Sequence, residues 1–166
     1  MSCQDSVERV LCLMKDTFGD EFKTYYDGDP EVIPRFNLPC LIVMQTTDNT
    51  SESETGSDDV DDEIRIKLVF DKREDFDFDM TKDVDMTEKR LRKLVAGRGT
   101  DGRYLSTSVK GALREDLLDG PTAIAPTMTI QYGINPRETL GSEGNVPLTA
   151  EAWVTFTLRY AVDTYL

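Results

Sequence analysis

Residues 152–162 read AWVTFTLRYAV, and their bulky apolar side chains recur at every second position. This period of two is typical of a β-strand that buries one face. At about 3.3 Å per residue the strand extends roughly 35 Å, which favours an interior place in its sheet. Its other face carries Trp153 and Arg159, which either anchor a contact with a partner or pack beneath helices.

Three more strands are predicted from patterns of the same kind. Residues 40–44 form a short apolar run, residues 64–70 alternate in character, and Met128, Ile130 and Tyr132 alternate with threonine and glutamine. The first two of these strands are expected to pair with each other around the segment that joins them.

That joining segment, residues 48–63, reads DNTSESETGSDDVDDE and has one valine as its only bulky apolar side chain. Because so little apolar surface cannot offset the entropy of ordering the chain, a long, exposed, flexible loop is predicted. Its carboxylates either keep the protein soluble, collect divalent cations loosely, or face a partner or the lumen of an assembly. The candidates for such an interface or lumen are Asp58, Asp59, Asp61 and Asp62.

Helices are predicted over residues 6–18, 88–96 and 107–117, where apolar side chains recur every three or four positions. Thr87 is expected to cap the second helix, and Gly19 to end the first. Together with the strands, these helices predict a single α+β domain over all 166 residues, with a mainly antiparallel sheet flanked by two or three helices.

The protein is strongly acidic, with 32 acidic and 19 basic residues and a net charge of −13. The electrostatic field of such a protein opposes its approach to nucleic acid or to an anionic membrane surface. No apolar run is long enough to span a bilayer, and the N-terminus lacks the pattern of a secretion signal. We therefore expect the protein to be made in the cytoplasm and to make no membrane contact.

The sequence contains no histidine. This excludes Ser-His and Cys-His nucleophile pairs and every metal site that depends on histidine. Residues 97–102 spell G-x-G-x-x-G, but they follow a predicted helix, whereas a dinucleotide site needs a strand there. Residues 77–81 spell D-x-D-x-T without the strand that a phosphotransfer motif follows. No catalytic activity, cofactor or metal is predicted.

One basic cluster lies along the second predicted helix and just beyond its end. It consists of Lys89, Arg90, Arg92, Lys93 and Arg98. Part of this cluster complements the negative C-terminal end of the helix. Alternatively, the cluster contacts an acidic loop of a neighbouring copy, or DNA threaded through a ring.

The order of these elements resembles the tail terminator, or tail completion, proteins that cap the tail tube of long-tailed bacteriophages and related archaeal viruses. The resemblance rests on the amphipathic first helix, the strands at 40–44 and 64–70, the segment LRKLVAGRGTDGRYLSTSVKGALRE, and the closing strands TMTIQYGINPRE and EAWVTFTLRYAVDTY. It implies a structural protein in the neck region of a virion tail. Such proteins assemble as a sixfold ring, end tail polymerisation and join the tail tube protein to head–tail connector proteins, and DNA passes through the lumen. The acidic segment departs from a compact version of this pattern.

An adaptor or DNA-mimic protein that binds a basic partner is the alternative. A mimic is expected to present carboxylates at regular spacing on ordered elements. Because the densest acids fall in a predicted loop, the sequence favours the joining role.

Overall fold

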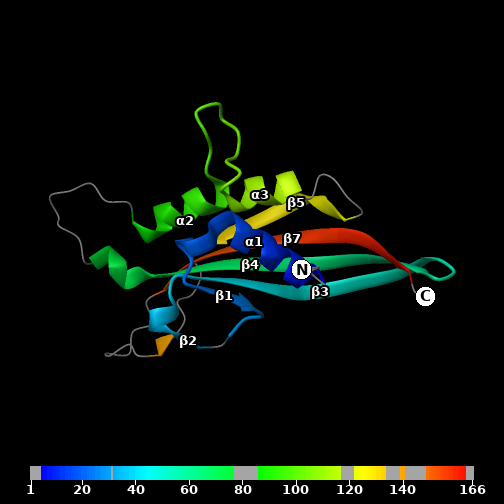
Figure 1. Ribbon diagram of the computed structural model, residues 1–166, viewed down its shortest axis with the longest axis horizontal. Helices are drawn as coiled ribbons and strands as arrows, with labels where there is room; N and C mark the ends of the chain where they lie inside the picture. Colours follow the sequence, from blue (N-terminus) through cyan, green and yellow to red (C-terminus); the bar gives the residue numbers. More distant parts are fainter. Residues whose placement is uncertain are drawn as a thin grey trace.

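The computed structural model describes residues 5–30, 32–76, 86–116, 122–133, 139–140 and 149–163. Within these residues it has three α-helices, α1 (Ser6–Phe18), α2 (Thr87–Ala96) and α3 (Val109–Asp116), and a mainly antiparallel sheet of five strands (Figure 1). The predicted α+β fold is therefore confirmed. None of the described helices is long and apolar enough to cross a membrane.

The sheet has the strand order β1-β3-β4-β7-β5. Its strands are β1 (Thr24–Asp27), β3 (Cys40–Glu54), β4 (Ser57–Asp71), β5 (Ala123–Tyr132) and β7 (Thr149–Asp163). All neighbours are antiparallel except β1 and β3, which are parallel. The predicted pairing of residues 40–44 with residues 64–70 is confirmed, since Cys40 lies opposite Val69. The interior place predicted for the closing strand is also confirmed, because β7 lies between β4 and β5.

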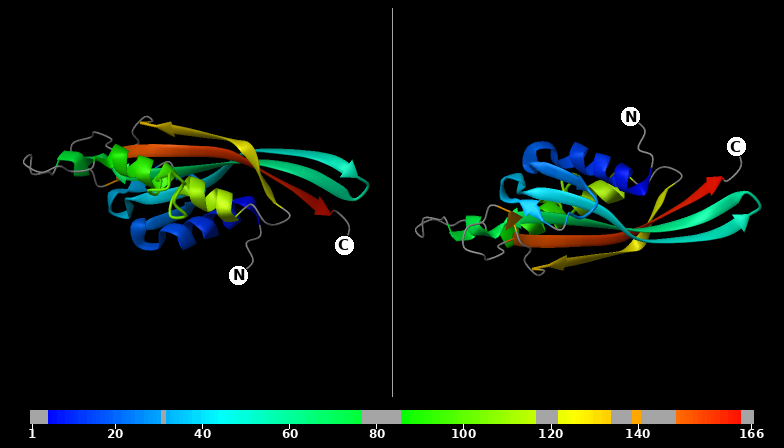
Figure 2. Two further views of the ribbon diagram at one scale, coloured as in Figure 1. Left: turned by 90° about the horizontal axis from the view of Figure 1, so that it is seen from above. Right: turned by 90° about the horizontal axis from the view of Figure 1, so that it is seen from below.

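All three helices cover one face of the sheet (Figure 2). Gly19 follows the last residue of α1 and ends the helix. Its φ is 51°, a value that glycine adopts without strain. The apolar stripe of α1 is buried against alternate residues of β3, β4 and β7, so the helical and strand periodicities meet in one core. Each large apolar side chain buried there contributes about 1.5–3 kcal/mol.

The chain between β1 and β3 covers part of the opposite face of the sheet. This segment contains β2 (Ile33–Pro34), which pairs in parallel with β6 (Thr139–Leu140), and the 3-10 helix η2 (Arg35–Asn37). Ile33 packs there in a smaller apolar cluster with Leu38, Cys40, Ile42 and Val69. No described α-helix lies on this side of the sheet, which we call the helix-free face.

The predicted cap of α2 is wrong, because Thr87 lies inside the helix. Its amide and hydroxyl donate hydrogen bonds of 2.8 and 2.7 Å to the carboxylate of Asp75, in the 3-10 helix η3 (Lys72–Phe76). A carboxylate twelve residues earlier therefore satisfies the amide that a local cap usually serves.

Candidate interaction surfaces

The segment predicted to be a flexible loop is an ordered β-hairpin, so that prediction is wrong. β3 continues to Glu54, Thr55 and Gly56 form the turn, and β4 begins at Ser57. Gly56 has a φ of 87°, which suits a two-residue hairpin turn. We call residues 48–62 the acidic arm. The arm projects beyond the layer of helices at one end of the molecule (Figures 1 and 2).

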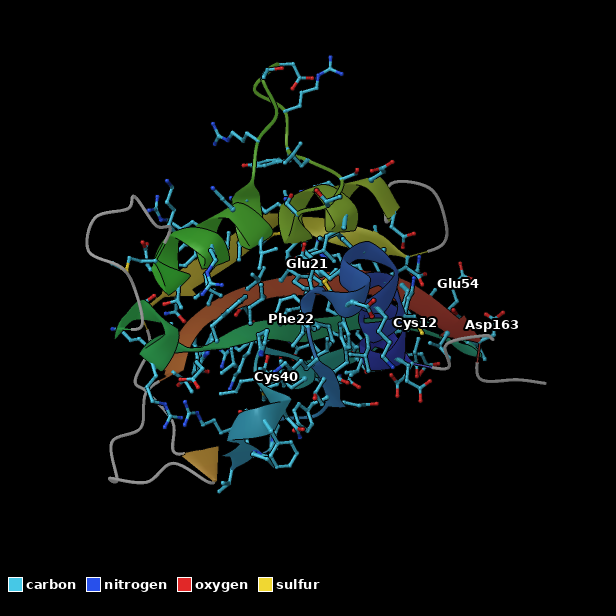
Figure 3. All side chains as sticks on the ribbon, turned by 60° about the vertical axis from the view of Figure 1, so that its left-hand side comes forward. Cys12, Glu21, Phe22, Cys40, Glu54 and Asp163 are labelled. Atoms are coloured by element: carbon cyan, nitrogen blue, oxygen red, sulfur yellow. The ribbon has the colours of Figure 1, made fainter. Side chains whose placement is uncertain are left out.

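Neighbouring strands order the arm despite its low apolar content. Residues 57–62 of β4 pair with β3 on one side and with the end of β7 on the other. Val60 is buried where it lies opposite Thr50 and Tyr160. Glu54 and Asp163, at the ends of β3 and β7, lie together at this end of the molecule, away from Phe22 in the core (Figure 3). The composition of the segment does not reflect the backbone pairing that the third strand, β7, supplies.

The arm contains like charges that face each other across its two strands. Asp48 lies directly opposite Asp62, and Glu52 lies directly opposite Asp58. Cβ atoms of such opposite residues are about 4.5–5.5 Å apart, and like charges there destabilise the pairing. The charge of the arm therefore works against its own folding.

Alternate residues of β4 place Asp59 and Asp61 of the arm, and Glu63 just beyond it, together on the helix-free face. Asp59 is exposed, and Asp61 lies 3.6 Å from Arg159 of β7 in an ion pair whose two side chains are largely exposed. An ion pair of this kind contributes at most about 1 kcal/mol. This face is thus acidic and accessible to a partner.

Asp62 does not lie on the surface of the arm, contrary to the prediction for it. Its exposed fraction is 3%, and it faces the helices at the base of the arm. Its carboxylate accepts hydrogen bonds from the Ser6 hydroxyl at 2.6 Å, the Gln45 amide at 2.9 Å and the Tyr160 hydroxyl at 2.5 Å. These donors come from α1, β3 and β7, so one carboxylate joins the first helix to the arm.

The environment of Tyr160 fits this arrangement. Burial raises the pKa of the Tyr160 phenol, and the hydrogen bond to Asp62 raises it further. Ser6 lies 56 residues before Asp62 in the chain, so no local pattern in the sequence could have indicated the contact.

The basic cluster predicted on the second helix is divided by the structure. Lys89, Arg92 and Lys93 are exposed on α2. Arg90 turns inward, with its guanidinium carbon 5.3 Å from the centre of the Phe70 ring. Arg90 therefore packs against the core, and the other three side chains point outward.

Arg98 lies outside α2, in a finger formed by residues 97–105 that projects from the layer of helices (Figure 1). Arg98 and Tyr104 form an antiparallel bridge, and the Leu105 amide donates to the Gly97 carbonyl at 2.9 Å. Gly102 turns the finger with a φ of 81°. The glycines of the G-x-G-x-x-G motif thus lie in a hairpin-like finger that follows a helix, in agreement with the sequence analysis.

The base of the finger is joined tightly to α3. Ser108 accepts a hydrogen bond from the Gly111 amide at 3.1 Å and donates one from its hydroxyl to the Leu105 carbonyl at 2.7 Å. Ser108 therefore caps α3, which begins at Val109 and not at residue 107 as predicted. Leu117, the predicted end of this helix, lies outside the described residues.

Tyr104 organises the cations of the finger. The guanidinium of Arg98 lies 5.4 Å and the ammonium of Lys110 lies 5.1 Å from the centre of its ring. A hydrogen bond from Lys110, together with the charges of Lys110 and Arg98, lowers the pKa of the Tyr104 hydroxyl. We call the outward basic side chains of α2, the finger and α3 the basic ridge, which consists of Lys89, Arg92, Lys93, Arg98, Arg103 and Lys110.

Trp153 and Arg159 lie on the helix-free face, so the alternative that they pack beneath the helices is wrong. The reason is the parity of β7, whose even-numbered residues 152–158 face the helices. Trp153 is half-buried, with its ring centre 4.8 Å from the Arg65 guanidinium and 4.2 Å from the Lys67 ammonium. Its indole N–H donates to Glu151 at 3.2 Å. Trp153 is thus held by neighbours in its own sheet.

Within the part of the chain that the structure describes, no group of three cysteine, aspartate or glutamate side chains could hold a metal ion. The D-x-D-x-T segment at residues 77–81 lies outside that part. No protein-family model matches the sequence, and a search of the curated proteins finds no match.

Proposed function

We propose that this protein is a structural protein that caps the tail tube of a long-tailed virus as a ring, ends tail polymerisation and joins the tail to the head connector. The observation that supports this proposal is the acidic arm, an ordered hairpin that projects beyond the core. The facing carboxylates of Glu52 and Asp58 oppose its folding. An ordered element that costs stability on its own gains most from contact with another molecule.

In this function the chain acts through binding and assembly, without a catalytic step or a cofactor. Its partners are other copies of itself in the ring, the tail tube protein and the head–tail connector proteins, in the neck region of the virion. DNA is a partner only in passing through the lumen. Asp62, being buried, is not among the residues that line such a lumen or interface.

The mass of the purified protein in solution tests this proposal. Light scattering over a series of salt and protein concentrations is expected to give about 112 kDa, six times the 18.7 kDa chain. Negative-stain images of the same sample are expected to show rings with a central hole. A strict monomer under every condition would contradict the ring.

A variant without the arm tests whether the arm builds the ring. Replacing residues 49–61 by Asn-Gly leaves Asp48 opposite Asp62 across a two-residue turn, which suits a type I′ hairpin. This variant keeps Asp62 and its donors Ser6 and Gln45, while it removes Val60, the strand partner of Tyr160, and it is expected to fold but to remain a monomer. Rings formed by the armless variant would show that assembly uses another surface.

One observation favours a second candidate, an adaptor or DNA-mimic protein. Asp59, Asp61 and Glu63 lie on an ordered strand, roughly 6.6 Å apart, which is the regular spacing expected of a mimic. In the structure these acids lie in a strand and not in a loop, so their position does not count against a mimic. A monomer that displaces duplex DNA from a basic DNA-binding protein would favour this candidate over the ring.

A further inference from the structure

Opposite charges are segregated along the chain and in space. Residues 48–63 contain eight acidic and no basic side chains, whereas residues 87–114 contain eight basic and two acidic ones. The first segment builds the arm, and the second builds α2, the finger and most of α3. The arm extends from the end of the molecule away from α2 (Figures 1 and 2). The tip of the arm and α2 of one copy therefore do not meet each other.

The dimensions of the two surfaces are compatible. Seven residues of β3 in the arm extend roughly 23 Å, and the ten residues of α2 extend about 15 Å before the finger adds to the ridge. The arm carries carboxylates on both of its faces, so it presents charge whichever face approaches a partner.

The finger has the composition of an interface. Tyr104 is 41% and Leu105 is 43% exposed, and the cations of Arg98 and Lys110 lie over the Tyr104 ring. Aromatic side chains and arginine are enriched at the centres of interfaces. Because contact with the aromatic ring of Tyr104 already orients these cations, they lose less conformational entropy on binding an anionic partner than free side chains would lose.

We propose that the acidic arm of one copy docks on the basic ridge of the next copy. This inference rests on the proposed ring and names the contact that builds it. Because the two surfaces differ, the contact is heterologous, and its repetition closes a ring if the rotation between neighbours permits. The ridge also relieves the repulsion between Glu52 and Asp58 in the docked arm.

Duplex DNA is the competing occupant of the ridge. The net charge of −13 opposes the approach of a polyanion from a distance. The arm, in contrast, belongs to the same protein and is present wherever the ridge is. Close pairs in a desolvated contact are also screened less by salt than exposed pairs are, so docking persists at salt concentrations that weaken DNA binding.

Complementary charge reversal tests the docking. The arm variant carries Glu52→Lys, Asp58→Lys and Asp59→Lys. The ridge variant carries Arg98→Glu, Arg103→Glu and Lys110→Glu. Each variant alone is expected to be a monomer, because like charges across a contact weaken it on the order of a hundredfold. An equimolar mixture is expected to regain the wild-type mass, since the reversed positions of the arm then meet the reversed positions of the finger and α3, and each unchanged arm meets an unchanged ridge.

A third variant controls for net charge. Asp16, Asp20 and Glu21 are exposed on α1 and the turn that follows it, and their reversal to lysine changes the net charge as much as the arm variant does. This control is expected to keep the wild-type mass. Circular dichroism checks that each variant is folded, and glutamine at the three ridge positions gives a milder change that is expected to weaken assembly without abolishing it.

The outcomes separate the docking from the ring. If both reversal variants still form rings of the wild-type mass, the docking is overturned and the ring is left intact. The same holds if each variant is a monomer but the mixture does not reassemble. A ridge variant that loses binding to a short DNA duplex while its mass stays unchanged would overturn the docking in favour of DNA. A wild-type protein that is monomeric under every condition would contradict both the ring and the docking.

Discussion

Asp62 joins α1 to the arm, and its replacement by alanine is expected to lower the free energy of unfolding by about 3 kcal/mol. The carboxylate is 3% exposed and accepts three hydrogen bonds. Hydrogen bonds to a charged group contribute about 1.5–3 kcal/mol each, and removing a buried acceptor leaves its donors unsatisfied. Loss of the desolvation penalty and of the repulsion from Asp48 offsets part of this sum.

Urea unfolding followed by circular dichroism measures the effect. In a chain of this size the same change corresponds to a fall in Tm of about 6–12 °C. Asp62→Asn is expected to cost only about 1 kcal/mol, because the amide oxygen still accepts and the hydroxyls of Ser6 and Tyr160 can turn to accept from its N–H.

The control is Asp58→Ala, on the same strand and the same side of the arm. Asp58 lies opposite Glu52, so its removal relieves a like-charge pair and is expected to leave stability unchanged or slightly raised. If Asp62→Ala changes stability by less than about 0.5 kcal/mol, as surface substitutions do, then the reasoning about the buried carboxylate is wrong.

Three other expected outcomes concern the finger, the arm and Tyr25. Gly111→Ala places Cβ 1.9 Å from the Leu105 carbonyl oxygen of the finger and is expected to cost about 3 kcal/mol or more, on the order of severe overpacking. Gly99→Ala meets most closely the Asp101 carboxylate oxygen, at 3.1 Å, which accepts from the Arg103 amide, and it is expected to cost less in thermal unfolding. Glu52→Gln is expected to slow hydrogen exchange of the arm amides at low salt, because it removes the repulsion from Asp58, and the effect should vanish at about 1 M salt. Burial, with two neighbouring carboxylates, raises the pKa of Tyr25 to about 12, so its contribution to stability is fully present below about pH 10 and is lost as the pH rises towards 12. Wild type should therefore lose more stability than Tyr25→Phe between those pH values, and equal losses would contradict the raised pKa.

Local patterns predicted much of the fold. The helix predicted over residues 6–18 has those bounds in the structure, because its apolar spacing and the glycine that ends it are contained in the segment itself. The strands at 40–44, 64–70 and 128–132 are likewise present, within longer strands. The charged surfaces were predicted only in part, since the basic cluster was found but Arg90 proved to pack inward, and Arg103 and Lys110 were not included.

Most of the errors depended on a partner that is distant in the sequence. The arm is ordered by the end of β7, about 100 residues away, and Asp62 is buried by donors from α1 and β7. Asp75 takes the place of a local cap at α2, and the parity of β7 against the core decides which way Trp153 faces. Nothing within any one of these segments reports on such neighbours.

The sequence by itself determined the α+β class, the positions of the main helices and strands, and the segregation of acidic and basic residues along the chain. Periodicity and composition are local properties, so they can be read without knowledge of the fold. Only the tertiary structure decided that the acidic segment is an ordered arm, that Asp62 is buried in it, and that the arm lies away from α2. These features follow from strand pairing and packing between distant segments, where backbone hydrogen bonds from a neighbouring strand can order a polar chain that its own side chains cannot.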